Sequence, residues 1–205
     1  MKSILFHTDR YRQAEEQIRS FLNKQDDFLS ESTAESTRAV GDAIQDILAE
    51  HCGTILGPEM CLNYSASFAR RSMADLAFED ANGCYYVVDV KTHRESTKFN
   101  MPNLTSVERL ARFYEEERNY FAILMVTYDV QVVRAVVSGV TFVPIEFLGW
   151  DCLTIGALGW GQIQIANSNV VTINPGYSRK KWMLEMCDAL IEFYPKELSK
   201  NREAD

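Results

Sequence analysis

The chain has 205 residues, of which 46% are hydrophobic, and this length is enough for one domain with a substantial core over residues 1–205. It contains no apolar run near the roughly 20 residues of a membrane span, and its N-terminus lacks the apolar core of a signal peptide. The formal net charge of -8 counts against a nucleic-acid partner but does not exclude one, because binding depends on the local field of a cleft.

The first predicted elements are two helices. Asp9 is the expected N-cap of a helix over residues 10–23, with Tyr11, Ala14, Ile18 and Phe21 as its apolar stripe. Residues 25–36 are polar and predict a loop, and a second helix follows over residues 37–51, ended by Gly53. Acidic side chains in or before this second helix either form a solvated face or supply one acid to an active site. They are Glu35, Asp42, Asp46 and Glu50.

Residues 54–73 predict a connection in which Arg70 and Arg71 are either phosphate contacts or surface charge. A β-hairpin follows, with strands over residues 74–78 and 84–91 and a turn at Asn82-Gly83.

Three charged side chains converge at the open end of this predicted hairpin. Asp89 and Lys91 are two residues apart and share one face, and Asp75 lies beside them on the neighbouring strand. Crowded charges at a strand end cost free energy unless a cation or partner compensates. A divalent metal held by Asp75 and Asp89, with Lys91 facing a phosphate, would compensate, and Mg²⁺ suits such oxygen ligands.

The rest of the chain alternates between helical and extended patterns. Thr105-x-x-Glu108 is a predicted capping box that opens a helix to about Asn119. The apolar runs 121–128 and 131–138 predict strands buried on both faces, and residues 160–166 alternate, with Gln162 and Gln164 on one side. Ser178 caps a last helix to about Tyr194, followed by a frayed tail. The predicted fold class is α/β (mixed α+β), with a central mixed β-sheet flanked by helices.

The stretch around the hairpin resembles the PD-(D/E)xK nucleases, and more specifically the type II restriction endonucleases of the HincII/EcoRV type. The motif positions are Ala74-Asp75-Leu76, then Val88-Asp89-Val90-Lys91-Thr92, then Pro102-Asn103. A weaker similarity covers Gln162-Ile163-Gln164-Ile165 and the helix that carries Trp182. Ala74 stands where the motif's name has Pro. The resemblance implies a restriction-endonuclease-like core.

The resemblance also implies a function: Mg²⁺-dependent hydrolysis of double-stranded DNA at a short palindromic sequence by a cytoplasmic homodimer, leaving blunt ends. Asp75, Asp89 and the backbone carbonyl of Val90 would hold the metal. Lys91 would orient or deprotonate a water, or stabilise charge. The residues expected at the DNA are Thr92, His93, Arg94, Asn100, Asn103, Gln162 and Gln164, and the Asn and Gln amides suit contact with adenine.

Other interpretations stay open. The same core would serve a repair or recombination nuclease, and a chance D-x-K would leave a non-catalytic binding protein. Gln162 and Gln164 are otherwise a solvated strand face, and Asn100 a loop tip. His93 as a general base, and His7 and His51 as metal ligands, are weaker alternatives. The five scattered cysteines form no C-x-x-C pair, which favours reduced thiols over a disulfide frame or a zinc site.

Overall fold

The computed structural model describes residues 2–25, 29–64 and 74–203, with side chains up to residue 200. Arg70 and Arg71 lie outside the described residues. The chain groups into two compact units: residues 1–98 with 116–144, and residues 99–115 with 145–205. The single-domain organisation stays a prediction. None of the described helices is long and apolar enough to cross a membrane, and the five cysteines are free thiols.

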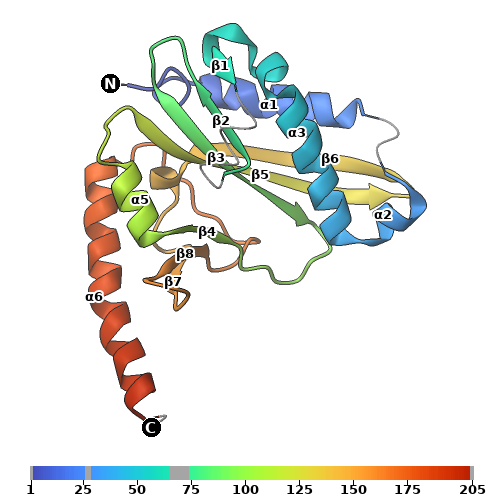
Figure 1. Cartoon of the computed structure of the whole chain (residues 1–205). Helices are drawn as coiled ribbons and strands as arrows, with labels where there is room; N and C mark the ends of the chain where they lie inside the picture. The colour runs from blue at the N-terminus through green and yellow to red at the C-terminus, as the bar shows by residue number, and fades with distance from the viewer. Residues whose placement is uncertain (1, 26–28, 65–73, 204–205) are drawn as a thin grey trace. The chain divides into compact units, whose positions relative to one another are not determined.

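A five-stranded mixed sheet forms the centre of the first unit (Figure 1). Its strand order is β1-β2-β3-β5-β6, and only the β3–β5 pair is parallel. The strands are β1 (Asn63–Tyr64), β2 (Leu76–Glu79), β3 (Tyr85–Arg94), β5 (Asn119–Gln131) and β6 (Arg134–Pro144). Residues 120–124 of β5 are all buried, as their continuous apolar run predicts. The mixed sheet with its helices confirms the predicted α/β fold class.

Three helices accompany this sheet: α1 (Arg10–Asn23), α2 (Glu31–Glu35) and α3 (Thr37–Met60). The bounds of α1 are those predicted, although Leu22 is buried in place of Phe21, and Asp9 makes no side-chain cap. The prediction of a loop over residues 25–36 is wrong in part, because this stretch contains the short helix α2. The N-cap of α2 is Ser30, whose hydroxyl accepts a hydrogen bond from the Thr33 amide.

The predicted end of the second helix at Gly53 is also wrong. The helix α3 continues to Met60 and departs from helical geometry only at Gly57, whose φ is +76°. Its apolar spacing continues through Cys52, Leu56 and Met60, all of which are buried. This burial outweighs the roughly 1 kcal/mol that a glycine costs inside a helix.

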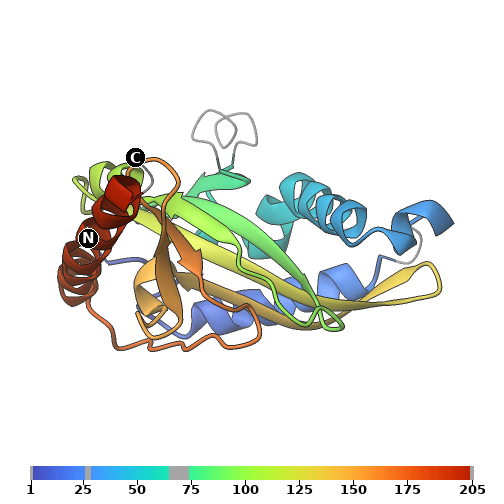
Figure 2. The same ribbon diagram turned by 90° about the horizontal axis from the view of Figure 1, so that it is seen from below.

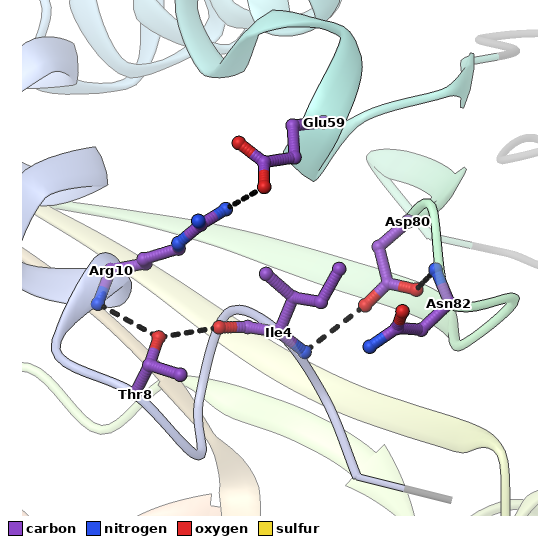
Figure 3. A network of polar contacts seen from close by, with 6 residues as sticks. All are labelled: Ile4, Thr8, Arg10, Glu59, Asp80 and Asn82. Atoms are coloured by element: carbon purple, nitrogen blue, oxygen red, sulfur yellow. Dashed lines mark hydrogen bonds and ion pairs between the residues drawn. The ribbon is translucent and has the colours of Figure 1, made fainter.

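Asp80 organises the turn between β2 and β3. One of its carboxylate oxygens, Oδ1, accepts hydrogen bonds from the amides of Asn82 and Cys84, each at 2.9 Å. The other, Oδ2, accepts from the Tyr86 hydroxyl at 2.6 Å. It also accepts from the Ile4 amide at 3.2 Å (Figure 3). Asp80 is 1% exposed, so one buried carboxylate joins the hairpin to the N-terminal segment. Nearby, an Arg10–Glu59 ion pair of 2.7 Å connects α1 to α3 (Figure 3).

The hairpin of β5 and β6 ends in a two-residue turn, visible at one end of the sheet in Figure 2. Gln131 pairs with Arg134, and between them Val132 has a φ of +60° and is 91% exposed. A turn with positive φ at its first central residue favours glycine there.

We therefore expect Val132→Gly to stabilise the protein. A left-handed conformation costs a β-branched residue about 1–2 kcal/mol, and glycine's greater loss of chain entropy offsets about 0.5–1 kcal/mol of that. The free energy of unfolding in urea should rise by about 0.5–1 kcal/mol. Val170→Gly is the control, because Val170 is exposed and lacks a positive φ, and it should not stabilise.

The second unit contains a three-stranded antiparallel sheet of order β4-β8-β7 and a long helix. Its elements are β4 (Asn103–Ser106), α5 (Val107–Phe113), the 3-10 helix η1 (Ile145–Phe147), β7 (Leu153–Gly156), β8 (Gln162–Ile165) and α6 (Arg179–Glu203). The predicted alternation in β8 is confirmed, since Ile163 and Ile165 are buried and the two glutamines are half-buried.

Three predicted helix boundaries in this unit are wrong. Thr105 lies in β4, so it cannot open a capping box; Ser106 is the N-cap, and its hydroxyl accepts from the Arg109 amide. The helix α5 ends at Phe113 rather than Asn119 because the chain enters β5 at Asn119. The last helix begins after Ser178 as predicted but continues to Glu203 and does not end near Tyr194.

Candidate functional site

Asp75 stands immediately before β2, beside the middle of β3. Leu76 pairs with Val88, so the next position outward brings Asp75 opposite Asp89. The Asp75 amide donates to the Val88 carbonyl at 3.1 Å, and its carboxylate Oδ2 accepts from the Val90 amide at 2.6 Å. The carboxylate thus supplies Val90 of β3 with an acceptor at a point that precedes the first residue of β2.

Asp89 and Lys91 share one face of β3, as their spacing predicts. Lys91 Nζ lies 2.8 Å from Asp89 Oδ1. The Lys91 side chain is 26% exposed and that of Asp89 is 14% exposed, so the ion pair is mostly but not fully removed from solvent. The structure therefore brings two carboxylates and one ammonium to the same stretch of β3, beside the position that precedes β2.

Gln45 of α3 is a site residue that the sequence reasoning missed. Its side-chain amide Nε2 donates to the Val90 carbonyl at 3.0 Å. The helix reaches β3 because Gly41, one turn earlier, has no side chain: a Cβ there would lie 2.5 Å from Thr92 Oγ1. The acids considered for this role, Glu35, Asp42, Asp46 and Glu50, are exposed instead. The sequence signal that could have identified Gln45 is its place in the helix. It follows the apolar Ile44 directly and lies one turn after Gly41.

This arrangement offers oxygen ligands of the kind that Mg²⁺ binds. The carboxylates of Asp75 and Asp89 and the carbonyl of Val90 are hard donors, and the Gln45 amide Nε2 donates to that carbonyl. Among the described residues, no group of three or more His, Cys, Asp or Glu side chains has metal-binding geometry. A metal at this site would be coordinated by two carboxylates, a main-chain oxygen and water molecules. This ligand set suits Mg²⁺, which usually keeps several of its waters.

The end of β3 carries the residues expected at the DNA backbone. Thr92, His93 and Arg94 are all half-buried, and Thr92 packs against α3 at Gly41. Arg94 Nε lies 3.5 Å from Asp129 Oδ1 of β5, so its charge already has an acidic neighbour. A phosphate contact by Arg94 would have to compete with that ion pair.

The second unit holds the residues expected to read bases. Asn103 pairs with Gln164 across β4 and β8, and Gln164 Nε2 donates to Asn103 Oδ1 at 2.5 Å. Gln162 pairs with Ser106 after a register shift between Asn103 and Thr105, and it is half-buried like Gln164. Asn100 is half-buried, and its carbonyl accepts from the Ser168 amide at 2.9 Å. Three of the four predicted amides therefore lie together on one small sheet.

The histidines considered as metal ligands have aromatic neighbours. The ring of His7 lies 6.0 Å from Tyr120, and that of His51 lies 5.1 Å from Phe21.

No family model matches this chain, and a comparison with curated proteins finds no match. A functional assignment therefore depends on the residues and geometry described above.

Proposed function

We propose that this protein is a Mg²⁺-dependent deoxyribonuclease that hydrolyses phosphodiester bonds in double-stranded DNA at a short, palindromic sequence. This is the activity of a type II restriction endonuclease. The observation that carries the proposal is the position of Asp75, immediately before β2, opposite the Asp89–Lys91 ion pair of β3. The resemblance of these positions to the PD-(D/E)xK nucleases supports it, and so does the mixed sheet that holds them.

The proposed mechanism assigns one task to each group. Asp75, Asp89 and the Val90 carbonyl would hold Mg²⁺, which lowers the pKa of water and neutralises phosphate charge when bound. Lys91 adds a positive charge 2.8 Å from Asp89, where the scissile phosphate gathers negative charge as water attacks phosphorus. Water supplies a hydroxyl to phosphorus, and the leaving sugar oxygen takes a proton as the P–O bond breaks.

Sequence recognition would come from the amides of the second unit. Asn and Gln side chains make paired hydrogen bonds with adenine in the major groove. Asn103 and Gln164 are already in contact, so each can hold the other's orientation. A homodimer would match the two-fold symmetry of a palindromic site and cut both strands.

The deciding experiment is incubation of the purified chain with supercoiled plasmid and Mg²⁺, with EDTA as the control. Discrete fragments whose sequenced ends share one short blunt-cut motif would support the proposal. A smear, or a preference for junctions, mismatches or ends, would assign the same site to a repair or recombination nuclease. Absence of Mg²⁺-dependent cleavage on plasmids of varied sequence would contradict any nuclease function and leave a binding protein.

Gln45→Ala is expected to weaken the response to Mg²⁺. The substitution removes the partner of the Val90 carbonyl, and groups that orient metal ligands usually account for 10- to 100-fold in metal affinity or activity. The Mg²⁺ concentration for half-maximal cleavage should rise by about 10-fold or more. Glu50→Ala, an exposed change on the same helix, should leave it unchanged. Equal Mg²⁺ dependence of Gln45→Ala and wild type would show that Gln45 only packs against β3.

A further inference from the structure

Two of the five cysteines lie together at the C-terminal end of α3. The helix departs from helical geometry at Gly57, and one turn later the Cys61 amide donates to the Gly57 carbonyl at 2.9 Å. Beyond this break, Cys61 Sγ lies 3.9 Å from the position that a Cβ on Gly53 would occupy. Cys52 directly precedes that glycine, and its thiol shares a hydrogen bond with the Cys61 thiol. We call these two side chains the Cys52–Cys61 pair.

Tyr64 of β1 packs beside this pair. Its Cβ lies 3.6 Å from the position of a Gly53 Cβ, and its hydroxyl donates to the Ala49 carbonyl of α3. Burial, and then the two sulfurs, raise the pKa of Tyr64, so the phenol stays a donor. Cys52 and Cys61 are each 5% exposed, so the pair is buried close to the surface. Local opening admits a molecule as small as hydrogen peroxide to such a place.

The hydrogen bond makes the two thiols chemically unequal. It raises the pKa of Cys52, to which burial adds, and it lowers the pKa of Cys61 against the opposing effect of burial. Cys61 therefore ionises first, and the thiolate is the form of cysteine that attacks oxidants. The single buried Cys152 differs: its thiol donates to the Gly149 carbonyl at 3.1 Å, and burial raises its pKa. Only Cys61 combines a neighbouring thiol with a lowered pKa among the cysteines whose pKa shifts are described.

We propose that the Cys52–Cys61 pair is a site of reversible oxidation, at which hydrogen peroxide converts the two thiols into an intramolecular disulfide. The Cys61 thiolate attacks one peroxide oxygen, the O–O bond breaks, and the departing hydroxide takes up the proton that Cys61 released. The Cys52 sulfur then attacks the sulfur of the Cys61 sulfenic acid, and the S–O bond breaks as hydroxide leaves with the Cys52 proton. Two thiols and one peroxide thus give one disulfide and two waters. This site does not depend on the proposed nuclease activity.

The disulfide would fasten the end of α3 to the chain that enters β1. The amide of Leu62, next to Cys61, donates to the Glu79 carbonyl of β2 at 2.7 Å, so this segment already joins the sheet edge. The two sulfurs must approach to about 2 Å, and the helix break at Gly57 lies between them in the chain. A cross-link stabilises mainly by restricting the unfolded chain. The thermal unfolding midpoint of the oxidised protein should be about 5 °C higher than that of the reduced protein.

Oxidation of the full-length Cys187→Ser chain tests the proposal. This change removes the exposed thiol and leaves the four buried ones, at Cys52, Cys61, Cys84 and Cys152. After brief treatment with hydrogen peroxide and unfolding in guanidinium, thiol titration should find two thiols in place of four, and dithiothreitol should restore all four. Trypsin keeps the pair in one peptide, because no Lys or Arg lies between its members, and that peptide should be lighter by two hydrogen atoms. Four remaining thiols, or oxidation of Cys84 or Cys152 instead, would overturn the proposal.

Matched variants in the Cys187→Ser background assign the two roles. With Cys52→Ser, oxidation should stop at the Cys61 sulfenic acid, which dimedone labels when the quenched protein is unfolded in its presence. With Cys61→Ser, labelling of Cys52 should be at least 10-fold lower, because Cys52 has the raised pKa. With Cys84→Ser, the disulfide should form as in the parent. Equal labelling of the first two variants would contradict attack by Cys61.

A measurement on the wild-type sequence keeps the test decisive if a serine variant fails to fold. Iodoacetamide applied to the native protein blocks the exposed Cys187 first, and excess reagent is then removed. Peroxide should next produce the peptide with the internal Cys52–Cys61 disulfide, and the unfolding midpoint should rise as for Cys187→Ser. Absence of that peptide from the folded, alkylated wild type would overturn the proposal whatever the variants do.

Discussion

Asp89→Asn is expected to abolish Mg²⁺-dependent DNA cleavage while leaving the fold intact. The amide keeps the shape of the carboxylate, but it removes a charged metal ligand and the partner of Lys91 at 2.8 Å. Metal and charge stabilisation contribute several kcal/mol to such a transition state, and each 1.4 kcal/mol is a factor of 10 in rate. The rate should fall by about 10³-fold or more, measured under single-turnover conditions on a plasmid that wild type cuts.

The control for this change is Asp46→Asn, an identical substitution at an exposed position of α3. It should cleave like wild type and unfold at the same urea concentration. Lys91→Ala should also lose activity, by about 10²-fold or more, because it removes the charge beside the phosphate. Full activity of either Asp89→Asn or Lys91→Ala would remove this cluster from consideration as the active site.

Asp80→Ala should lower the free energy of unfolding by about 3–5 kcal/mol, the usual cost of breaking a buried charged network. Asp80 accepts four hydrogen bonds, from the amides of Ile4, Asn82 and Cys84 and from the Tyr86 hydroxyl. Burial, and then the hydrogen bond to Asp80, raise the pKa of Tyr86 well above its ordinary value, so the phenol stays a donor. Without the carboxylate, these buried donors lose their acceptor.

Urea denaturation followed by fluorescence measures this effect, and the midpoint should fall with little change in slope. Asp42→Ala is the matched control. Asp42 is exposed on α3, and its ion pair with Arg38 is long, at 3.8 Å, so its removal should cost well under 1 kcal/mol. A loss below 1 kcal/mol for Asp80→Ala would show that the turn and the N-terminal segment do not depend on the carboxylate.

The elements that local pattern defines were predictable from the sequence. The bounds of α1 follow from a helical stripe of apolar residues, and β5 follows from a continuous apolar run. The neighbouring positions of Asp75, Asp89 and Lys91 were predictable for the same reason. Hairpin register and strand alternation are set by residues close together in the chain.

Long-range packing decided what the sequence did not predict. Burial of Cys52, Leu56 and Met60 carries α3 past Gly53, and pairing of β4 with β8 takes Thr105 out of the predicted helix. Gln45 contacts the Val90 carbonyl, which is 45 residues away in the chain. One turn earlier, Gly41 lets the helix approach Thr92, because a Cβ there would lie 2.5 Å from Thr92 Oγ1.

The amino-acid sequence by itself determined the fold class, the amphipathic helices and the grouping of three charged residues at one hairpin end, because each depends on short-range periodicity. The tertiary structure alone decided which groups surround that cluster and which apolar face of α6 stays exposed. Those outcomes depend on how distant segments compete for the same buried surface, and periodicity carries no information about that competition.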